Sequence, residues 1–122
     1  MLHEISDVRQ VENDDFRRWF MDEFFDLIVW YDKRNRITGF QLCYDKIRNE
    51  HALTWRSGRG FIHTRIDDGE RPGSSKMSPI LVADGAFDKM SIAEHFKRES
   101  GQIDPEIAAF VFEKVMSYPE GR

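Results

Sequence analysis

The chain of 122 residues contains one cysteine, which excludes an intramolecular disulfide and a zinc site built from several cysteines. Its apolar runs are far shorter than the roughly 20 residues of a membrane-spanning helix. Internal repeats and low-complexity tracts are also missing. The first four residues lack a basic stretch followed by an apolar one, so we expect no signal peptide. One cytoplasmic domain over residues 1–122 is the resulting expectation.

The composition supplies enough apolar material for a folded core. Hydrophobic residues make up 40% of the chain and include ten Phe, three Trp and three Tyr, each of which buries a large area. Charged residues reach 33% but are mixed in sign, which argues against intrinsic disorder. The net charge of −4 is unevenly distributed, since residues 33–76 carry ten basic and five acidic groups. A basic patch in the middle of an acidic protein could attract anions.

Strand and helix signals predict an α+β fold. Segments rich in aromatic and β-branched residues are separated by polar or glycine-containing turns, which is typical of strands joined in sequence. The expected strands are 5–11, 16–20, 24–32, 37–44, 52–56, 61–67 and 79–83. A capping-box pattern at Ser91 to Glu94 predicts a helix that ends at Ser100, with Gly101 as a left-handed cap. Asp104 and Pro105 predict a second helix that ends before Pro119. We therefore expect an antiparallel meander of five to seven strands, packed on one face by two C-terminal helices.

Turn positions predict how these strands pair. A turn centred on residues 34–35 pairs Asp32 with Ile37, Val29 with Phe40 and Leu27 with Leu42. A two-residue glycine turn at 58–59 pairs Arg56 with Phe61, Trp55 with Ile62 and Leu53 with Thr64. The loop between the two hairpins keeps the apolar faces together if Leu42 pairs with Trp55 and Tyr44 pairs with Leu53.

These pairings divide the side chains between two faces of the sheet. The apolar face, expected to pack on the helices, holds Phe25, Leu27, Val29, Tyr31, Phe40, Leu42, Tyr44, Leu53, Trp55, Ile62, Thr64 and Ile66. The opposite face mixes polar and aromatic residues: Phe24, Asp26, Ile28, Trp30, Gln41, Cys43, Thr54, Arg56, Phe61, His63 and Arg65. Arginine beside aromatic rings suits carboxylates, phosphates or stacked bases. The candidate ligand-binding residues are therefore Trp30, Gln41, Arg56, Phe61, His63 and Arg65.

The same pairings bring two hairpin turns to one end of the sheet. That end would carry a basic rim of Lys33, Arg34, Arg36, Arg56 and Arg59, while the other end collects acidic groups. Basic turns can follow phosphates, but the acidic net charge argues against nucleic acid, and the chain has no RNA-binding strand signature. A solvated rim is the competing interpretation.

Three further patterns do not indicate a catalytic or metal-binding site. Asp26, Cys43, Thr54 and His63 form a cross-strand row, but Cys43 and His63 would lie about 9–10 Å apart at ordinary strand spacing, too far for a thiol–imidazole pair. The carboxylates of residues 67–70 do not match a calcium loop, and the other histidines lack ligand spacing. We therefore expect no metal and no cofactor.

No motif resembles a characterised family, and the sequence leaves three functions open. The favoured hypothesis is a small non-enzymatic binding module that uses the polar-aromatic face or a strand edge to hold a protein or a small anionic ligand. An enzyme for a small phosphate or carboxylate substrate is the first alternative, with Arg56, His63 and Arg65 as binding and acid–base residues. A weak single-stranded nucleic-acid binder is the second. Self-association as a homodimer would cover exposed strand edges and also remains open.

Overall fold

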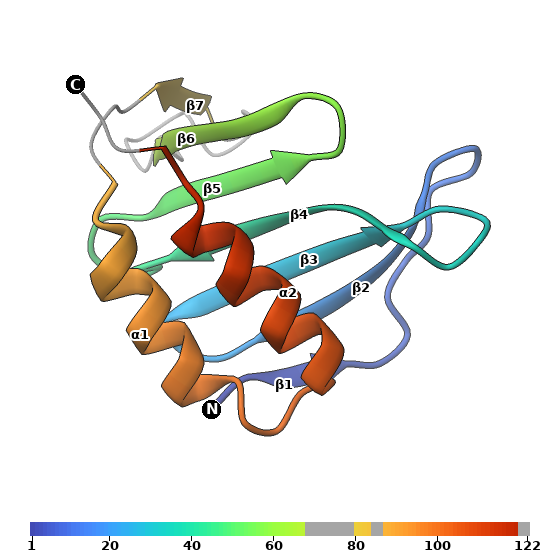
Figure 1. The fold of residues 1–122 in the computed structure, drawn as a ribbon, viewed down its shortest axis with the longest axis horizontal. Helices are drawn as coiled ribbons and strands as arrows, with labels where there is room; N and C mark the ends of the chain where they lie inside the picture. The colour runs from blue at the N-terminus through green and yellow to red at the C-terminus, as the bar shows by residue number, and fades with distance from the viewer. Residues whose placement is uncertain (68–79, 84–86, 120–122) are drawn as a thin grey trace, which may run out of the picture.

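The computed structural model describes residues 1–67, 80–83 and 87–119. Their strands are β1 (His3–Ile5), β2 (Phe16–Met21), β3 (Phe25–Tyr31), β4 (Ile37–Tyr44), β5 (His51–Arg56), β6 (Gly60–Asp67) and β7 (Ile80–Ala83). They form one antiparallel sheet whose strand order follows the sequence. Two helices follow, α1 (Lys89–Glu99) and α2 (Pro105–Met116). The expected α+β fold, with a meander sheet and two C-terminal helices, is confirmed (Figure 1).

Both helices lie on the same face of the sheet (Figure 1). The apolar side chains of the strands and the inward stripes of the helices make one core. Its fully buried members include Phe20, Phe25, Leu27, Val29, Phe40, Leu42 and Leu53 from the sheet, and Phe96, Val111 and Val115 from the helices. Among the described elements, no helix covers the opposite face of the sheet. We call the two sides the helix face and the outer face.

The N-terminal strand differs from the sequence prediction. β1 covers only residues 3–5, and residues 6–15 form the connection to β2 rather than a strand over 5–11. The apolar residues of that segment do not alternate, so they offer no continuous buried face to a strand. Leu2 is buried, and its N–H donates to the carbonyl of Glu99 at 2.8 Å, which ties the start of the sheet to the end of α1.

The helix ends are partly as predicted. Asp104 caps α2 by accepting from the N–H of Glu106 at 2.9 Å, with Pro105 at the first helical position. α1 begins one turn before the predicted capping box, because the side chain of Asp88 accepts from the N–H of Ser91 at 3.2 Å. The expected left-handed cap at Gly101 is also wrong, since the glycines with positive φ in the described chain are Gly58 and Gly60.

The β3–β4 hairpin follows the predicted register along most of its length. Val29 pairs with Phe40 and Leu27 with Leu42, as expected. Near the turn a β-bulge shifts the pairing, so Ile37 lies opposite Tyr31 and not opposite Asp32. The side chain of Asp32 instead organises the turn, accepting from the N–H groups of Arg34 and Arg36 at 2.9 Å each.

The two later registers were predicted wrongly. β4 and β5 pair Leu42 with Leu53 and Tyr44 with His51, two residues away from the predicted alignment, so the faces are kept. The β5–β6 loop has three residues instead of two, because Gly60 also adopts a left-handed conformation, at φ 83°. Arg56 therefore pairs with Gly60, and Leu53 with His63.

This one-residue change inverts the whole of β6. Phe61 and His63 lie on the helix face, where the Phe61 ring packs 5.3 Å from that of Tyr118. Ile62, which was predicted to lie in the core, is on the outer face and is 61% exposed. Thr64 and Ile66 share that outer face. The polar-aromatic face expected from sequence is thus divided between the two sides of the sheet.

Candidate functional site

Three of the six predicted ligand-binding residues lie together on the outer face. The guanidinium carbon of Arg56 is 4.0 Å from the ring centroid of Trp30, a cation–π contact that crosses Gly39 on the strand between them. A Cβ at Gly39 would come within 2.7 Å of the Arg56 side chain, so glycine makes this contact possible. Gln41 donates to the hydroxyl of Thr54 at 3.0 Å. Arg56 thus contacts Trp30, and Gln41 contacts Thr54, within the sheet itself.

The other three predicted residues lie on the helix face. Phe61, His63 and Arg65 follow the inverted register of β6 and are separated from Trp30, Gln41 and Arg56 by the sheet itself. His63 is buried, whereas Arg65 is exposed. The predicted single site of six residues is therefore wrong as a grouping, since no ligand can contact both sets across the sheet.

His63 belongs to an aromatic cluster that the sequence did not reveal. The phenolic oxygen of Tyr44 lies 2.6 Å from Nε2 of His63. The imidazole rings of His51 and His63 stack with their centroids 5.3 Å apart, and Phe87 packs 4.8 Å from His63. His95 of α1 joins the same region through Phe24, whose ring is 4.3 Å away. These histidines appeared scattered because strand pairing and helix docking, not sequence spacing, bring them together.

Cys43 is not part of a nucleophile system. Its strand partners are Asp26 and Ala52 instead of the predicted Thr54, and His63 lies on the other face of the sheet. Burial raises the pKa of the Cys43 thiol to about 12, and the nearby carboxylates of Glu50 and Asp26 act in the same direction. A thiol with this pKa is protonated at neutral pH and is a poor nucleophile.

We expect Cys43 to resist alkylation in the folded protein. At pH 8 a thiol of pKa about 12 has roughly 10⁻⁴ of its molecules as thiolate, against roughly a quarter for an ordinary cysteine of pKa about 8.5. Iodoacetamide labelling followed by mass spectrometry should therefore be about 10³-fold slower in buffer than in denaturing urea. Rates within tenfold of each other would contradict the buried environment.

The predicted basic rim does not remain basic in the fold. The hairpin loops that carry Lys33, Arg34, Arg36 and Arg59 do share one end of the sheet, on the right of Figure 1. However, the connection over residues 6–15 reaches the same end (Figure 1), and it brings Asp14 and Asp15 to the hollow that Lys33 also lines. Arg36 is also paired with Asp32 at 3.1 Å. This end carries mixed charge instead of a cationic track for phosphates.

Phe16, at the start of β2, is the centre of the surface that we take as the candidate site. Its side chain is 53% exposed and lines three hollows of about 310, 450 and 580 Å³. The first lies along the edge of β2, the second against residues 13–15 and 31–33, and the third against the start of α2. We call these hollows and the ring between them the Phe16 surface. Apolar walls come from Tyr31, Ile37 and Phe110.

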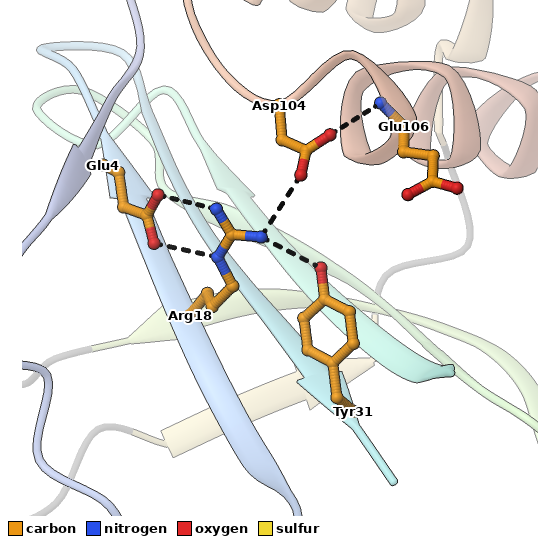
Figure 2. A network of polar contacts seen from close by, with 5 residues as sticks. All are labelled: Glu4, Arg18, Tyr31, Asp104 and Glu106. Atoms are coloured by element: carbon orange, nitrogen blue, oxygen red, sulfur yellow. Dashed lines mark hydrogen bonds and ion pairs between the residues drawn. The ribbon is translucent and has the colours of Figure 1, made fainter. Parts of the chain in front are cut away.

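An arginine network holds part of the wall of the third hollow, and Figure 2 shows its contacts. Arg18 binds the carboxylate of Glu4 through two nitrogens, at 2.7 and 2.9 Å, and contacts Asp104 at 3.4 Å. It also lies 3.5 Å from the Tyr31 hydroxyl, whose pKa is raised by burial. The hydrogen bond from Arg18 lowers the pKa of Glu4. Because Asp104 also caps α2, this network joins β1, β2, β3 and α2.

The connection over residues 6–15 is held against the sheet at Gln10 and at Asp15. The side-chain amide of Gln10 donates to the carbonyl of Arg17 and accepts from its N–H, both at 2.9 Å, as a neighbouring strand would. Thr38 donates to the carboxylate of Asp15 at 2.6 Å. The walls of the Phe16 surface are thus positioned by side-chain contacts that do not involve its exposed ring.

No group of three or more potential metal ligands occurs among the described residues, and the carboxylate loop that was considered as a metal site lies largely outside them. None of the described helices is long and apolar enough to cross a membrane. Comparison with protein-family models, with curated proteins and with solved structures gives no match for this chain.

Proposed function

We propose that the chain is a non-enzymatic binding module that holds a segment of a partner protein on the Phe16 surface. The observation that carries this proposal is the exposure of the Phe16 ring at the point where three hollows meet. A large exposed aromatic side chain beside concave surface is typical of the residues that dominate protein interfaces. Phe16 starts a strand, and its neighbours are held by Arg18, Gln10 and Asp15, so a ligand would meet a preorganised surface.

The enzyme hypothesis loses its geometric basis. It required Arg56 and Arg65 to hold an anion next to His63, but Arg56 lies across the sheet from the other two. His63 is buried among the rings of Tyr44, His51, Phe87 and Tyr118. Such packing favours a structural role for this histidine.

The nucleic-acid hypothesis is weakened by charge. Binding to phosphates draws on lysine and arginine side chains that are free to replace counterions. Arg36 is paired with Asp32, and acidic residues of the 6–15 connection lie at the same end. A peptide partner, which needs apolar anchoring more than a cationic track, fits this surface better.

The proposal can be tested by selecting random peptides displayed on phage against the folded protein. Peptides that bind should lose at least about 30-fold in affinity on Phe16→Ala, because an aromatic at the centre of an interface typically contributes 2 kcal/mol or more. Ile62→Ala is the matched control, since Ile62 is also an exposed apolar residue, at 61% against 53% for Phe16, but lies on the outer face. Its affinity should equal that of the unmodified protein in a fluorescence titration.

Two results would overturn the proposed surface. Selection that enriches no binding peptide would argue against a peptide-binding module. If peptides still bind the Phe16→Ala protein but do not bind the Trp30→Ala protein, the binding site is instead on the outer face, where Arg56 stacks on Trp30.

A further inference from the structure

We infer that the segment held by the Phe16 surface carries a lysine or arginine next to a large apolar side chain. This inference rests on the proposed function and adds the chemistry of its ligand. It follows from the charges around the three hollows, which the sequence alone had assigned the opposite sign.

The lining of the Phe16 surface is acidic. Seven acidic and four basic side chains line the three hollows, a net charge of −3. This is the end of the sheet for which the hairpin turns predicted a cationic rim. The reversal arises because the 6–15 connection and the start of α2 contribute most of the carboxylates, and both lie far from the hairpin turns in the sequence.

Two of the four basic groups of this lining are held in ion pairs, whereas Arg17 and Lys33 are in none that the described residues form. Arg18 is shared between Glu4 and Asp104, and Arg36 is paired with Asp32.

Among the acidic residues of this lining, Asp7, Asp14, Asp15 and Glu106 are in no ion pair with another described residue. Asp15 accepts from the Thr38 hydroxyl, and one oxygen of Asp14 accepts from the N–H of Asp15 at 2.8 Å. In Figure 2 the backbone of Glu106 contacts Asp104, while its carboxylate makes none of the drawn contacts. The carboxylate of Glu106 and the second oxygen of Asp14, which line the two larger hollows, are available to a cationic ligand.

The available carboxylates flank the apolar centre. Asp14 lines the hollow on the loop side of Phe16, and Glu106 lines the one on the helix side together with Ile37 and Phe110. A ligand that places an apolar group against Phe16 and Phe110 would bring its neighbouring groups next to carboxylates. Positive charge at those neighbouring positions is therefore favoured, and negative charge is disfavoured.

The arrangement of the hollows favours a peptide over a small cation. Three separate hollows surround one ring, and their walls come from the β1–β2 connection, the β3–β4 turn and α2. An extended segment can place successive side chains in neighbouring hollows, which a single small molecule cannot do. The occupant is accordingly a basic and apolar segment of another protein.

Three short peptides test this chemistry. They share a Leu-Trp centre and carry two lysines, two glutamines or two glutamates around it, and their binding is followed by NMR titration of the folded protein. The lysine peptide should bind about 3–10-fold more tightly than the glutamine peptide, which two solvent-exposed ion pairs can supply. The preference should shrink at high salt, because exposed charges are screened.

Charge variants assign the preference to this surface. Glu106→Gln and Asp14→Asn together should bring the lysine and glutamine peptides to equal affinity. Glu113→Gln, an exposed acid on the same helix that lines none of the three hollows, should leave the preference unchanged.

The outcomes separate this inference from the proposed function. Equal or tighter binding of the glutamine or glutamate peptide, with shifts still centred on Phe16, would overturn the charge inference alone. Failure of all three peptides to shift the signals around Phe16 would contradict the binding surface itself. If light scattering shows a dimer and Phe16→Ala dissociates it into monomers, the occupant of the surface is a second copy of this chain. That result would overturn the inference of a different partner protein.

Discussion

Phe96→Ala should lower the free energy of unfolding by about 3–5 kcal/mol, the usual cost of removing a buried phenylalanine ring. Phe96 is fully buried on α1 and packs edge-on against Phe25 of β3, with the ring centroids 5.9 Å apart. Its loss would remove apolar contact and leave a cavity between helix and sheet. Typical domain stabilities are only 5–15 kcal/mol, so this change would remove a large part of the total.

Urea denaturation followed by fluorescence should report this loss as a lower midpoint with an unchanged slope. Phe16→Ala is the matched control, because it removes the same ring from a position that is 53% exposed. We expect it to cost about 1 kcal/mol or less, in line with surface substitutions. Similar losses for the two variants would contradict the burial of Phe96. A folded Phe16→Ala protein is also the form needed for the peptide measurements.

The elements that the sequence predicted best are those fixed by local chemistry. The β3–β4 hairpin register follows from apolar alternation on both strands, and Val29 and Phe40 pair as expected. The start of α2 follows from adjacent cap residues, Asp104 and Pro105. In both cases the determining groups lie within a few residues of one another, so the pattern is readable without knowing the fold.

The β5–β6 register was predicted wrongly because two turn conformations suit the same glycine-containing sequence. A two-residue loop at 58–59 and a three-residue loop with Gly60 in the left-handed region both suit Ser57 to Gly60. The choice sets the face of every later side chain in β6. The sequence prediction therefore placed His63 on the wrong side of the sheet while assigning the strand itself correctly.

The Phe16 surface was not predictable because it is assembled from distant segments. Phe16 appeared as an ordinary strand residue, and no local pattern indicated that Phe110 would face it across the third hollow. Asp104 was identified as a helix cap, but its second contact, with Arg18, is 86 positions away in the chain. The charge of this surface depends on the same long-range arrangement, which explains why its sign was predicted incorrectly.

The register of β6 gives the second large expected effect, a contrast between adjacent residues. His63→Ala should cost about 2–4 kcal/mol, because it leaves a cavity among the surrounding rings and removes the group bonded to the Tyr44 hydroxyl. Ile62→Ala should cost about 0.5 kcal/mol or less, since Ile62 is 61% exposed on the outer face. Urea denaturation at pH 7.5 measures both.

The two-residue loop makes the opposite prediction, because it would bury Ile62 under the helices and turn His63 outward. If Ile62→Ala strongly lowered the free energy of unfolding and His63→Ala left it unchanged, the two-residue loop would be correct. His63 would then lie on the same face of the sheet as Arg56. The contrast between the two variants is more informative than either value, since uncertainties in the unfolded state affect neighbouring residues similarly. If His63 is buried, the side chains around it are packed against one another and offer no anchor to a partner. The exposed ring of Phe16 is then the better anchor.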